Sequence, residues 1–313
     1  MKISKVLKWS AIAGASLLGG GAYAFFWRFI SRPRPAYAED SLKRDKDGER
    51  FIKIVKEEKA WLKNQKPEHV SIQSFDGLTL RGIFLPAEGK SEKVILGVHG
   101  ITSCSSNEYA VIARFFHEQG YHFLMVDDRA HGESDGKYAG FGCLDREDCY
   151  RWVRYLDDRF NGKCSIFLHG VSMGAATVLM TSSMNLTPNV KGIIADCGYT
   201  SPMEEFQYCF KRELGIKGTA VLKLSSIICR LIAGYGYSDF STLEEVKKTK
   251  IPIFIIHGKE DDFVPTVMGR QIYDACVSEK RLWLVDGAAH ARSYYVAREE
   301  YEEKMLDFME EHL

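Results

Sequence analysis

Several signatures that would assign a protein to a common class are missing from this chain of 313 residues. Its 42 basic and 42 acidic side chains cancel, so the composition gives no reason to expect a nucleic-acid partner. The sequence has no G-x-x-x-x-G-K-[ST] loop for nucleotide phosphates, no G-x-G-x-x-G fingerprint and no internal repeat. These absences argue against nucleotide-dependent enzymes and repeat proteins, and we expect no cofactor.

The cysteine and histidine residues show neither a disulfide pattern nor a metal pattern. The eight cysteines include no C-x-x-C pair, and several fall in expected strands or helices, where cysteine behaves as a small buried hydrophobe. No pair of histidines has metal-binding spacing together with a nearby carboxylate. We therefore expect no disulfide framework and no metal site.

What the chain does contain is a G-x-S-x-G sequence at Gly170–Gly174, centred on Ser172. It follows the apolar, strand-like run Cys164–Leu168 and precedes the helix-like stretch Ala175–Met180. Glycine on both sides would let a strained serine with positive φ turn its hydroxyl outward without steric conflict. Strand, sharp turn and helix in this order predict a nucleophilic serine. The alternative is a turn whose serine only caps the helix.

Two strand-like runs downstream of this serine end in residues that could assist a nucleophile. Ile253–Ile256 leads into an acidic turn with Asp261 and Asp262, and Leu282–Val285 is followed by His290. A serine nucleophile needs a histidine base and an acid that orients the base. Serine, acid and histidine in this chain order, each just past the carboxyl end of an expected strand, is the arrangement of α/β-hydrolases.

Four motifs make the chain resemble a serine hydrolase of the α/β-hydrolase superfamily. The resemblance points to the branch of monoacylglycerol-lipase-like, cinnamoyl-esterase-like and prolyl-peptidase-like enzymes. The motifs are Val98–Ile101, Asp128–Ser134, the serine motif at 170–174, and His257–Pro265. They extend from about His69 to the C-terminus, and they are specific for the superfamily but give little information about the substrate.

The resemblance assigns three catalytic side chains. It makes Ser172 the nucleophile, His290 the general base and Asp261 the acid, because Asp261 stands at the aspartate of the family pattern H-G-x-x-D-x-x-V-P. Asp262 is the rival acid. Neighbouring residues at a strand end point in different directions, so we expect only one of the two to reach His290.

The resemblance also implies an oxyanion hole made by the backbone N–H groups of Ile101 and Met173. The loop at Ile101 has the simple H-G-x form and lacks the H-G-G-G form of hormone-sensitive-lipase-type esterases. His99 and His257 each precede a glycine at a strand end, and we expect them to be structural. In Asp128–Ser134 the first glycine of the family motif is replaced by alanine.

Alternating strand and helix patterns predict an α/β-hydrolase fold, with a mainly parallel sheet and helices on both faces. A hairpin at Asp76–Gly77 opens the domain. Helices without strands are expected at about 201–249, after the sixth strand, where the superfamily carries a lid. Apolar lid residues such as Leu222, Ile227 and Leu231 either form an acyl-binding wall or pack the lid onto the sheet.

The N-terminal region predicts a membrane segment at residues 1–31. An apolar run of roughly 19 residues, from Trp9 to Trp27, lies between lysines and arginines and approaches the ~20 residues of a membrane span. Its aromatic end suits an interfacial belt. A single-pass anchor is favoured, and a signal peptide cleaved at Ala22–Ala24 or Ala36–Ala38 is the alternative. The leading lysines favour an extracytoplasmic catalytic domain, whereas the cysteines favour a reducing compartment.

Together these patterns predict three segments and one activity. We expect the anchor at 1–31, a charged helical connector at 32–66 and the hydrolase domain at 67–313. The expected activity is cleavage of a carboxylic ester, small or lipid-like, through an acyl-enzyme. The alternatives are a peptidase or amidase of the prolyl-peptidase-like branch and a catalytically silent binding protein with the same fold.

Overall fold

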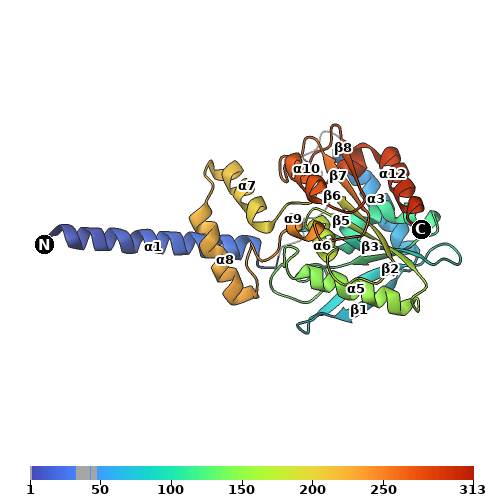
Figure 1. The fold of residues 1–313 in the computed structure, drawn as a ribbon, viewed down its shortest axis with the longest axis horizontal. Coiled ribbons are helices and arrows are strands. Elements are labelled where there is room, and N and C mark those ends of the chain that lie inside the picture. Colours follow the sequence, from blue (N-terminus) through green and yellow to red (C-terminus); the bar gives the residue numbers. More distant parts are fainter. Residues whose placement is uncertain (1, 33–42, 44–47) are drawn as a thin grey trace.

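The centre of the molecule is an eight-stranded sheet with helices on both faces (Figure 1). The computed structural model describes residues 2–32, 43 and 48–313. The strands are β1 (Glu68–Gln73), β2 (Thr79–Leu85), β3 (Lys93–Val98), β4 (His122–Val126), β5 (Ser165–Val171), β6 (Val190–Asp196), β7 (Ile253–Gly258) and β8 (Lys280–Val285). They lie in the order β1-β2-β4-β3-β5-β6-β7-β8.

The strand directions confirm the predicted fold class. β1 pairs antiparallel with β2, and β2 pairs antiparallel with β4, as an opening hairpin requires. All pairings from β4 to β8 are parallel. The carboxyl ends of these strands therefore meet at one edge of the sheet, which is where open α/β sheets bind ligands.

Alternation along the buried strands feeds two cores, one on each face of the sheet. Ile95 in β3 joins a cluster with α4 (Ser105–Glu118) and α12 (Arg298–Glu311). Its neighbours Val94 and Leu96 join the opposite cluster, with α5 (Asp145–Arg159), α6 (Met173–Thr181) and α10 (Thr266–Ala275). Successive side chains of a strand point to opposite faces, so β3 supplies both cores. The short α11 (Ser293–Val296) precedes α12.

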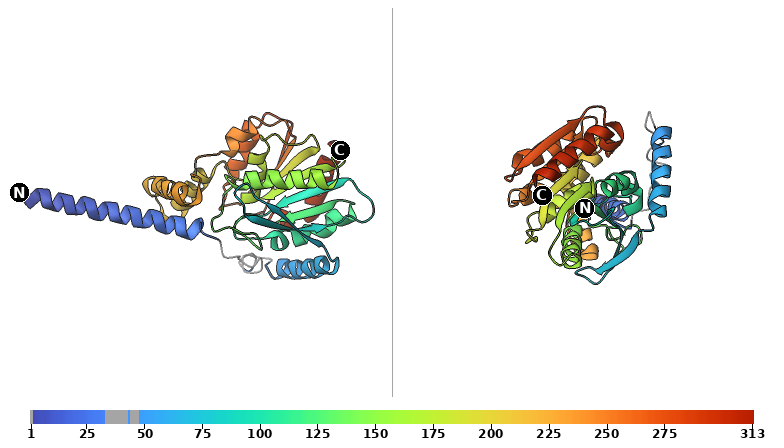
Figure 2. Two further views of the ribbon diagram at one scale, coloured as in Figure 1. Left: turned by 90° about the horizontal axis from the view of Figure 1, so that it is seen from below. Right: turned by 90° about the vertical axis from the view of Figure 1, so that its right-hand side faces the viewer.

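Helix α3 (Gly48–Asn64) lies along the outside of α4 (Figure 2). Its buried residues Phe51, Val55 and Leu62 join the core on that side. The spacing of these residues matches one face of a helix. The helix lies inside the connector predicted at 32–66, and the rest of that segment is outside the described residues except for 32, 43 and 65–66.

Three helices between β6 and β7 form the lid. They are α7 (Pro202–Leu214), α8 (Thr219–Ala233) and α9 (Thr242–Val246). Ser201 caps α7 by accepting a hydrogen bond from the Glu204 N–H at 3.3 Å, and Gly215 ends the helix with a φ of 73°. In α8, Leu222 is buried whereas Ile227 and Leu231 are exposed, so the last two do not belong to an internal acyl-binding wall.

Helix α1 (Lys2–Phe29) projects from the lid end of the molecule, and its C-terminal part packs on the protein (Figures 1 and 2). Phe25 contacts the Phe206 ring of α7 at a centroid distance of 5.2 Å, and Phe26 contacts Tyr138 at 5.5 Å. Arg32 donates hydrogen bonds to the carbonyl oxygens of residues 132, 134 and 136. The apolar end of α1 is therefore attached to the hydrolase domain.

This packing corrects one sequence-based assignment. Phe25 and Phe26, which belong to the aromatic end that suited an interfacial belt, are buried against protein, whereas Tyr23 and Trp27 are exposed. None of the helices in the described part of the chain combines the length and the apolarity that crossing a membrane requires. The structure therefore gives no support to the transmembrane helix predicted at residues 1–31.

Candidate active site

Ser172 occupies a sharp turn between β5 and α6, with φ of 55° and ψ of −113°. This strained conformation for a non-glycine residue is the one expected of a nucleophile elbow. A methyl group at Gly170 would collide with the Gly174 backbone, and one at Gly174 would collide with the Val98 carbonyl group. The two glycines thus allow α6 to pass close to the ends of β3 and β5.

Ser172, His290 and Asp261 form one continuous chain of hydrogen bonds. His290 Nε2 lies 2.9 Å from Ser172 Oγ, and His290 Nδ1 lies 2.7 Å from Asp261 Oδ2. With Asp261 ionised, Nδ1 carries the proton and donates to the carboxylate, which leaves Nε2 to accept from the serine hydroxyl. The structure therefore brings together the three side chains that the sequence singled out.

Asp261, and not Asp262, faces His290. Asp261 is buried, and its second oxygen accepts hydrogen bonds from the Phe263 and Val264 N–H groups at 3.0 and 2.9 Å. Asp262 is exposed, and its carbonyl oxygen accepts a hydrogen bond from Arg212 of the lid at 2.7 Å. The turn after β7 thus directs one carboxylate inward and ties its neighbour to α7.

The pKa values of Asp261 and His290 are shifted in the directions that favour the charged form of each side chain. Burial raises the pKa of Asp261, but His257 and His290 beside it bring the pKa down to about 2. Burial lowers the pKa of His290, but the hydrogen bond and the charge of Asp261 outweigh it and leave the pKa above its ordinary value of 6.5. At neutral pH the carboxylate is therefore ionised and ready to stabilise a protonated imidazole.

The loop after β3 lies beside the serine. A Cβ atom at Gly100 would approach the Ser172 Cβ atom to 3.4 Å, which places the neighbouring Ile101 next to the elbow. Met173 is the first residue of α6, so its N–H is one of the helix donors without an intrahelical partner. His99 secures the loop: its Nε2 accepts from the Asp128 N–H at 3.1 Å and its Nδ1 contacts the Gly100 carbonyl oxygen at 2.7 Å.

A carboxyl group of the lid, which no sequence motif marks, faces the same site. Glu205 of α7 is buried, and Cys209 Sγ donates to it at 3.0 Å. Its other oxygen has no hydrogen-bond partner among the described residues. Burial raises the pKa of Glu205 to about 7, and its charge acts to raise the pKa of His290. Sequence reasoning missed Glu205 because only the folded lid brings it near the histidine.

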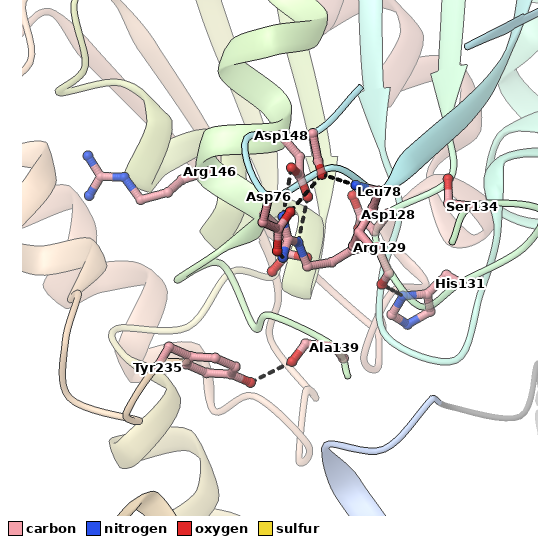
Figure 3. Close-up of polar contacts among 12 residues, drawn as sticks. Asp76, Leu78, Asp128, Arg129, His131, Ser134, Ala139, Arg146, Asp148 and Tyr235 are labelled. Atoms are coloured by element: carbon pink, nitrogen blue, oxygen red, sulfur yellow. Dashed lines mark hydrogen bonds and ion pairs between the residues drawn. The ribbon is translucent and has the colours of Figure 1, made fainter. Parts of the chain in front are cut away.

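The loop after β4, at Asp128–Ser134, holds a second buried cluster of charges, shown in Figure 3. Arg129 makes two hydrogen bonds to Asp148, at 2.6 and 2.9 Å, and two to Asp76, at 3.0 and 3.2 Å. Tyr235 of the lid segment donates to the Ala139 carbonyl oxygen at 2.5 Å. These contacts join the opening hairpin, α5 and the lid, which is a structural role.

The described residues contain one group of side chains close enough together to hold a metal ion. Potential ligand atoms of Cys197, Asp261 and His290 lie within 4.8 Å of one another. The carboxylate and imidazole of this group already bind each other in the hydrogen-bonded chain to Ser172. Two of its three members are therefore already hydrogen-bonded partners.

The strand order and the elbow define an α/β-hydrolase. In agreement, the family model described as serine aminopeptidase, S33, matches residues 89–226. An esterase from Pyrococcus furiosus superposes with a TM-score of 0.65 and 25% sequence identity, over 80% of this chain and 93% of that protein. The chain is a hydrolase of the α/β-hydrolase superfamily.

Two curated relatives extend this result. Protein YqkD of Bacillus subtilis, which is uncharacterised, is 27% identical over 76% of this chain and 78% of its own length. The lysophosphatidylserine lipase ABHD12 of Danio rerio is 24% identical over 61% of this chain. The match spans 49% of that lipase.

Proposed function

We propose that the protein is a serine hydrolase that cleaves a carboxylic ester through an acyl-enzyme. Ser172 is the nucleophile, His290 the general base and Asp261 the acid. The observation that carries the proposal is the unbroken chain of hydrogen bonds from Ser172 Oγ through the imidazole to Asp261, at 2.9 and 2.7 Å. It also argues against a silent binding protein, which would have no need of an ionised carboxylate behind this histidine.

In the first half of the reaction, Ser172 Oγ attacks the ester carbonyl carbon while its proton passes to His290 Nε2. The N–H groups of Ile101 and Met173 stabilise the negative oxygen that forms. The leaving alcohol takes the proton from His290 as its bond to carbon breaks. In the second half, water attacks the acyl-enzyme, His290 takes and returns a proton, and the acid is released.

Lipid-like esters are the proposed substrate class. The lid contributes Phe206 and Leu222 to an apolar cluster that also contains Met173, next to the nucleophile. Such a wall favours apolar acyl chains, with each buried CH₂ contributing up to about 0.8 kcal/mol. The relative named as a lysophosphatidylserine lipase supports the same class. A peptidase or amidase is the second candidate, and the serine aminopeptidase family model supports it.

We further propose that the N-terminal segment associates with a membrane and that the catalytic domain is extracytoplasmic. The basic residues on both sides of the apolar run, including Lys8 and Arg28, support membrane association. The proposed division into a membrane-associated segment at 1–31, a connector at 32–66 and a hydrolase domain at 67–313 follows the same boundaries. The lid begins at about 201 and ends at about 249.

Fluorophosphonate labelling tests the nucleophile. The wild-type protein should be labelled and should hydrolyse esters, whereas Ser172→Ala should lose both properties and keep its fold by circular dichroism. The elbow backbone tolerates alanine because the strain resides in φ and not in the hydroxyl group. Ser134→Ala is the matched control, since Ser134 is equally buried but donates to the Asp127 carbonyl oxygen in the loop after β4. Full labelling of folded Ser172→Ala would contradict the assignment.

A series of soluble esters with increasing acyl length tests the substrate class. We expect kcat/KM to rise from acetyl to medium-chain esters, because each added CH₂ is removed from water. Ile228→Asp, at a half-buried position of α8 within the apolar lid cluster, should reduce this gain more than it reduces acetyl-ester turnover. A flat profile, or faster cleavage of aminoacyl amides than of any ester, would favour the peptidase candidate.

A further inference from the structure

Exposed large apolar side chains gather at one end of the molecule. Among the described residues, five of them lie on α1, five lie between residues 214 and 232 of the lid, and five are scattered over the rest of the chain. The first ten are Leu17, Leu18, Tyr23, Trp27, Phe29, Leu214, Ile216, Ile227, Leu231 and Ile232, here called the lid–α1 face. A gathering of this kind on a protein surface marks a binding surface.

Helix α8 presents one face to the protein and another to its surroundings. Leu222, Ser225 and Cys229 are buried. Lys223, Ile227 and Leu231 follow one another at intervals of four residues, so they share a different face of the helix. Ile227 is 55% exposed and Leu231 is 81% exposed. The side of α8 that faces away from the protein therefore carries large apolar residues, which is not expected of a helix whose outer side meets only water.

Helix α1 continues this surface. It packs along α8 and projects beyond it (Figure 1). The rings of Tyr23 and Trp27 are exposed and stack at 6.5 Å, one helical turn apart. Tyrosine and tryptophan prefer the boundary between water and lipid, because their rings are apolar and their polar atoms can reach water.

The charges at this end favour a lipid surface over a protein partner. Residues 214–233 contain Lys217, Lys223 and Arg230 and no acidic residue, and Arg230 pairs with Asp239, so the positive charge of this segment rests on Lys217 and Lys223. The sequence of α1 has no charged residue between Lys8 and Arg28. Apolar side chains flanked by cations, without acidic residues, are typical of helices that lie in the headgroup region of an anionic bilayer.

We propose that the lid–α1 face docks on an anionic lipid surface, with the exposed side of α8 seated in the headgroup region. The lid then lies between the lipid and Ser172, and an ester in the adjoining monolayer reaches the serine without crossing bulk water. This second step rests on the proposed ester hydrolysis, whereas docking itself does not. The lid is therefore a membrane-binding element as well as a cover for the site.

Quenching by brominated lipids tests the docking directly. The full chain, wild type, Leu231→Trp or Val277→Trp, is bound to vesicles of phosphatidylglycerol and phosphatidylcholine with bromine on the acyl chains. Val277 is 66% exposed but precedes β8, at the edge of the sheet opposite the lid. The emission added by Leu231→Trp should be quenched and that added by Val277→Trp should not. Equal quenching of the two would overturn the proposal.

Turnover tests the route of the substrate. Ile227→Asp/Leu231→Asp should hydrolyse a vesicle-dispersed long-chain ester about tenfold more slowly than wild type, since two apolar side chains no longer enter the lipid. The same variant should hydrolyse a soluble acetyl ester normally. Val277→Asp adds the same kind of charge elsewhere and should change neither rate. Wild-type turnover of the vesicle ester by the double aspartate variant would contradict the route.

Two further experiments distinguish a failure of the docking proposal from a failure of the proposed ester hydrolysis. If the double aspartate variant fails to fold, Lys217→Glu/Lys223→Glu replaces it, and this variant should lose turnover on anionic vesicles but not on pure phosphatidylcholine. No difference between the two vesicle types would count against anionic docking. A wild-type protein that hydrolyses no ester and takes no fluorophosphonate label would refute the proposed function, while the quenching result would still decide the docking.

Discussion

Asp261 and Asp128 are both buried carboxyl groups at the same edge of the sheet, and their pKa values move in opposite directions. The pKa of Asp261 falls to about 2. Burial and the carboxyl groups of Asp145 and Asp148 raise the pKa of Asp128 well above its ordinary range. Both side chains are about equally hidden from water, so burial alone does not decide which of them is ionised.

The difference lies in the donors. Asp261 receives hydrogen bonds from the Phe263 and Val264 N–H groups and from His290. One oxygen of Asp128 has no hydrogen-bond partner among the described residues. Donors stabilise the charged form, whereas neighbouring acids and a dry environment disfavour it. The surroundings of Asp261 therefore stabilise its charged form, whereas burial and the neighbouring carboxyl groups favour the protonated form of Asp128.

The largest expected effect comes from neutralising Asp261. Asp261→Asn should lower kcat by about 10⁴-fold, because the imidazole loses both its preferred tautomer and the charge that stabilises its protonated form. The pH at which kcat/KM rises should fall as well, since Asp261 raises the pKa of His290. Steady-state kinetics across pH measures both. Asp262→Asn is the control, and an equal loss there would show that the other aspartate orients the histidine.

The second prediction concerns removal of the cation from the charged cluster that follows β4. Arg129→Met should reduce the free energy of unfolding by about 3–5 kcal/mol, because Asp148 loses its cation while it stays buried. With Arg129 present, burial raises the pKa of Asp148 to about 6, so its protonated form supports the fold in acid and the carboxyl group becomes charged as pH rises through about 6, where the variant no longer pairs it with a cation. Urea titrations should therefore find a larger loss at pH 8 than at pH 5.

A second substitution checks the reason for that loss. Arg129→Met/Asp148→Leu removes the stranded carboxylate together with the arginine, so it should recover part of the lost stability. Failure to recover any, or a loss in Arg129→Met that is independent of pH, would show that the arginine matters through packing against Phe75 and not through its charge.

The smallest expected effect concerns Glu205, which resembles Asp128 in one respect and Asp261 in another. It is buried with an unpartnered oxygen, as Asp128 is, yet its charge acts on His290, as that of Asp261 does. Glu205→Gln should move the acid limb of kcat/KM to lower pH by less than about one unit, since the pKa of His290 loses one raising influence. The exposed neighbour Glu204→Gln is the control.

The pKa of Glu205 itself limits the shift. At about 7, this carboxyl group is largely neutral in acid and charged above neutrality, so it raises the pKa of His290 fully only above pH 7. An acid limb that is unchanged in Glu205→Gln, or that moves to higher pH, would remove Glu205 from the electrostatics of the site.

The sheet and the serine elbow could be predicted because their patterns are local. Apolar runs and the turn residues that flank them occur within a few positions of each other, and the strand-like runs Ile253–Ile256 and Leu282–Val285 lie within β7 and β8. Gly170 and Gly174, which lie where the backbone of the elbow passes close to neighbouring backbone, can be read directly from the G-x-S-x-G pattern. For the partner of His290, the sequence narrows the choice to two adjacent residues.

The environment of α1 and the place of Glu205 could not be predicted. The hydrophobic effect has no direction, so an apolar helix end fits a lipid tail or a lid equally well. The sequence of Phe25 and Phe26 does not contain the rings of Phe206 and Tyr138 that cover them. In the same way, no residue close to Glu205 in the sequence indicates that this side chain will lie near His290, 85 positions later. Both features arise from long-range packing.

The tight passage of α6 past β3 limits how this enzyme could lose its activity in evolution. Gly174 is pressed against the Val98 carbonyl group, so a larger residue there would damage the fold before it affected chemistry. The side chain of Ser172 is free of that constraint. A silent descendant would therefore keep both glycines and exchange the serine between them. In a homologous sequence the two glycines would indicate the shape of the turn, and, if Ser172 is the nucleophile as proposed, only the serine would indicate that the activity is retained.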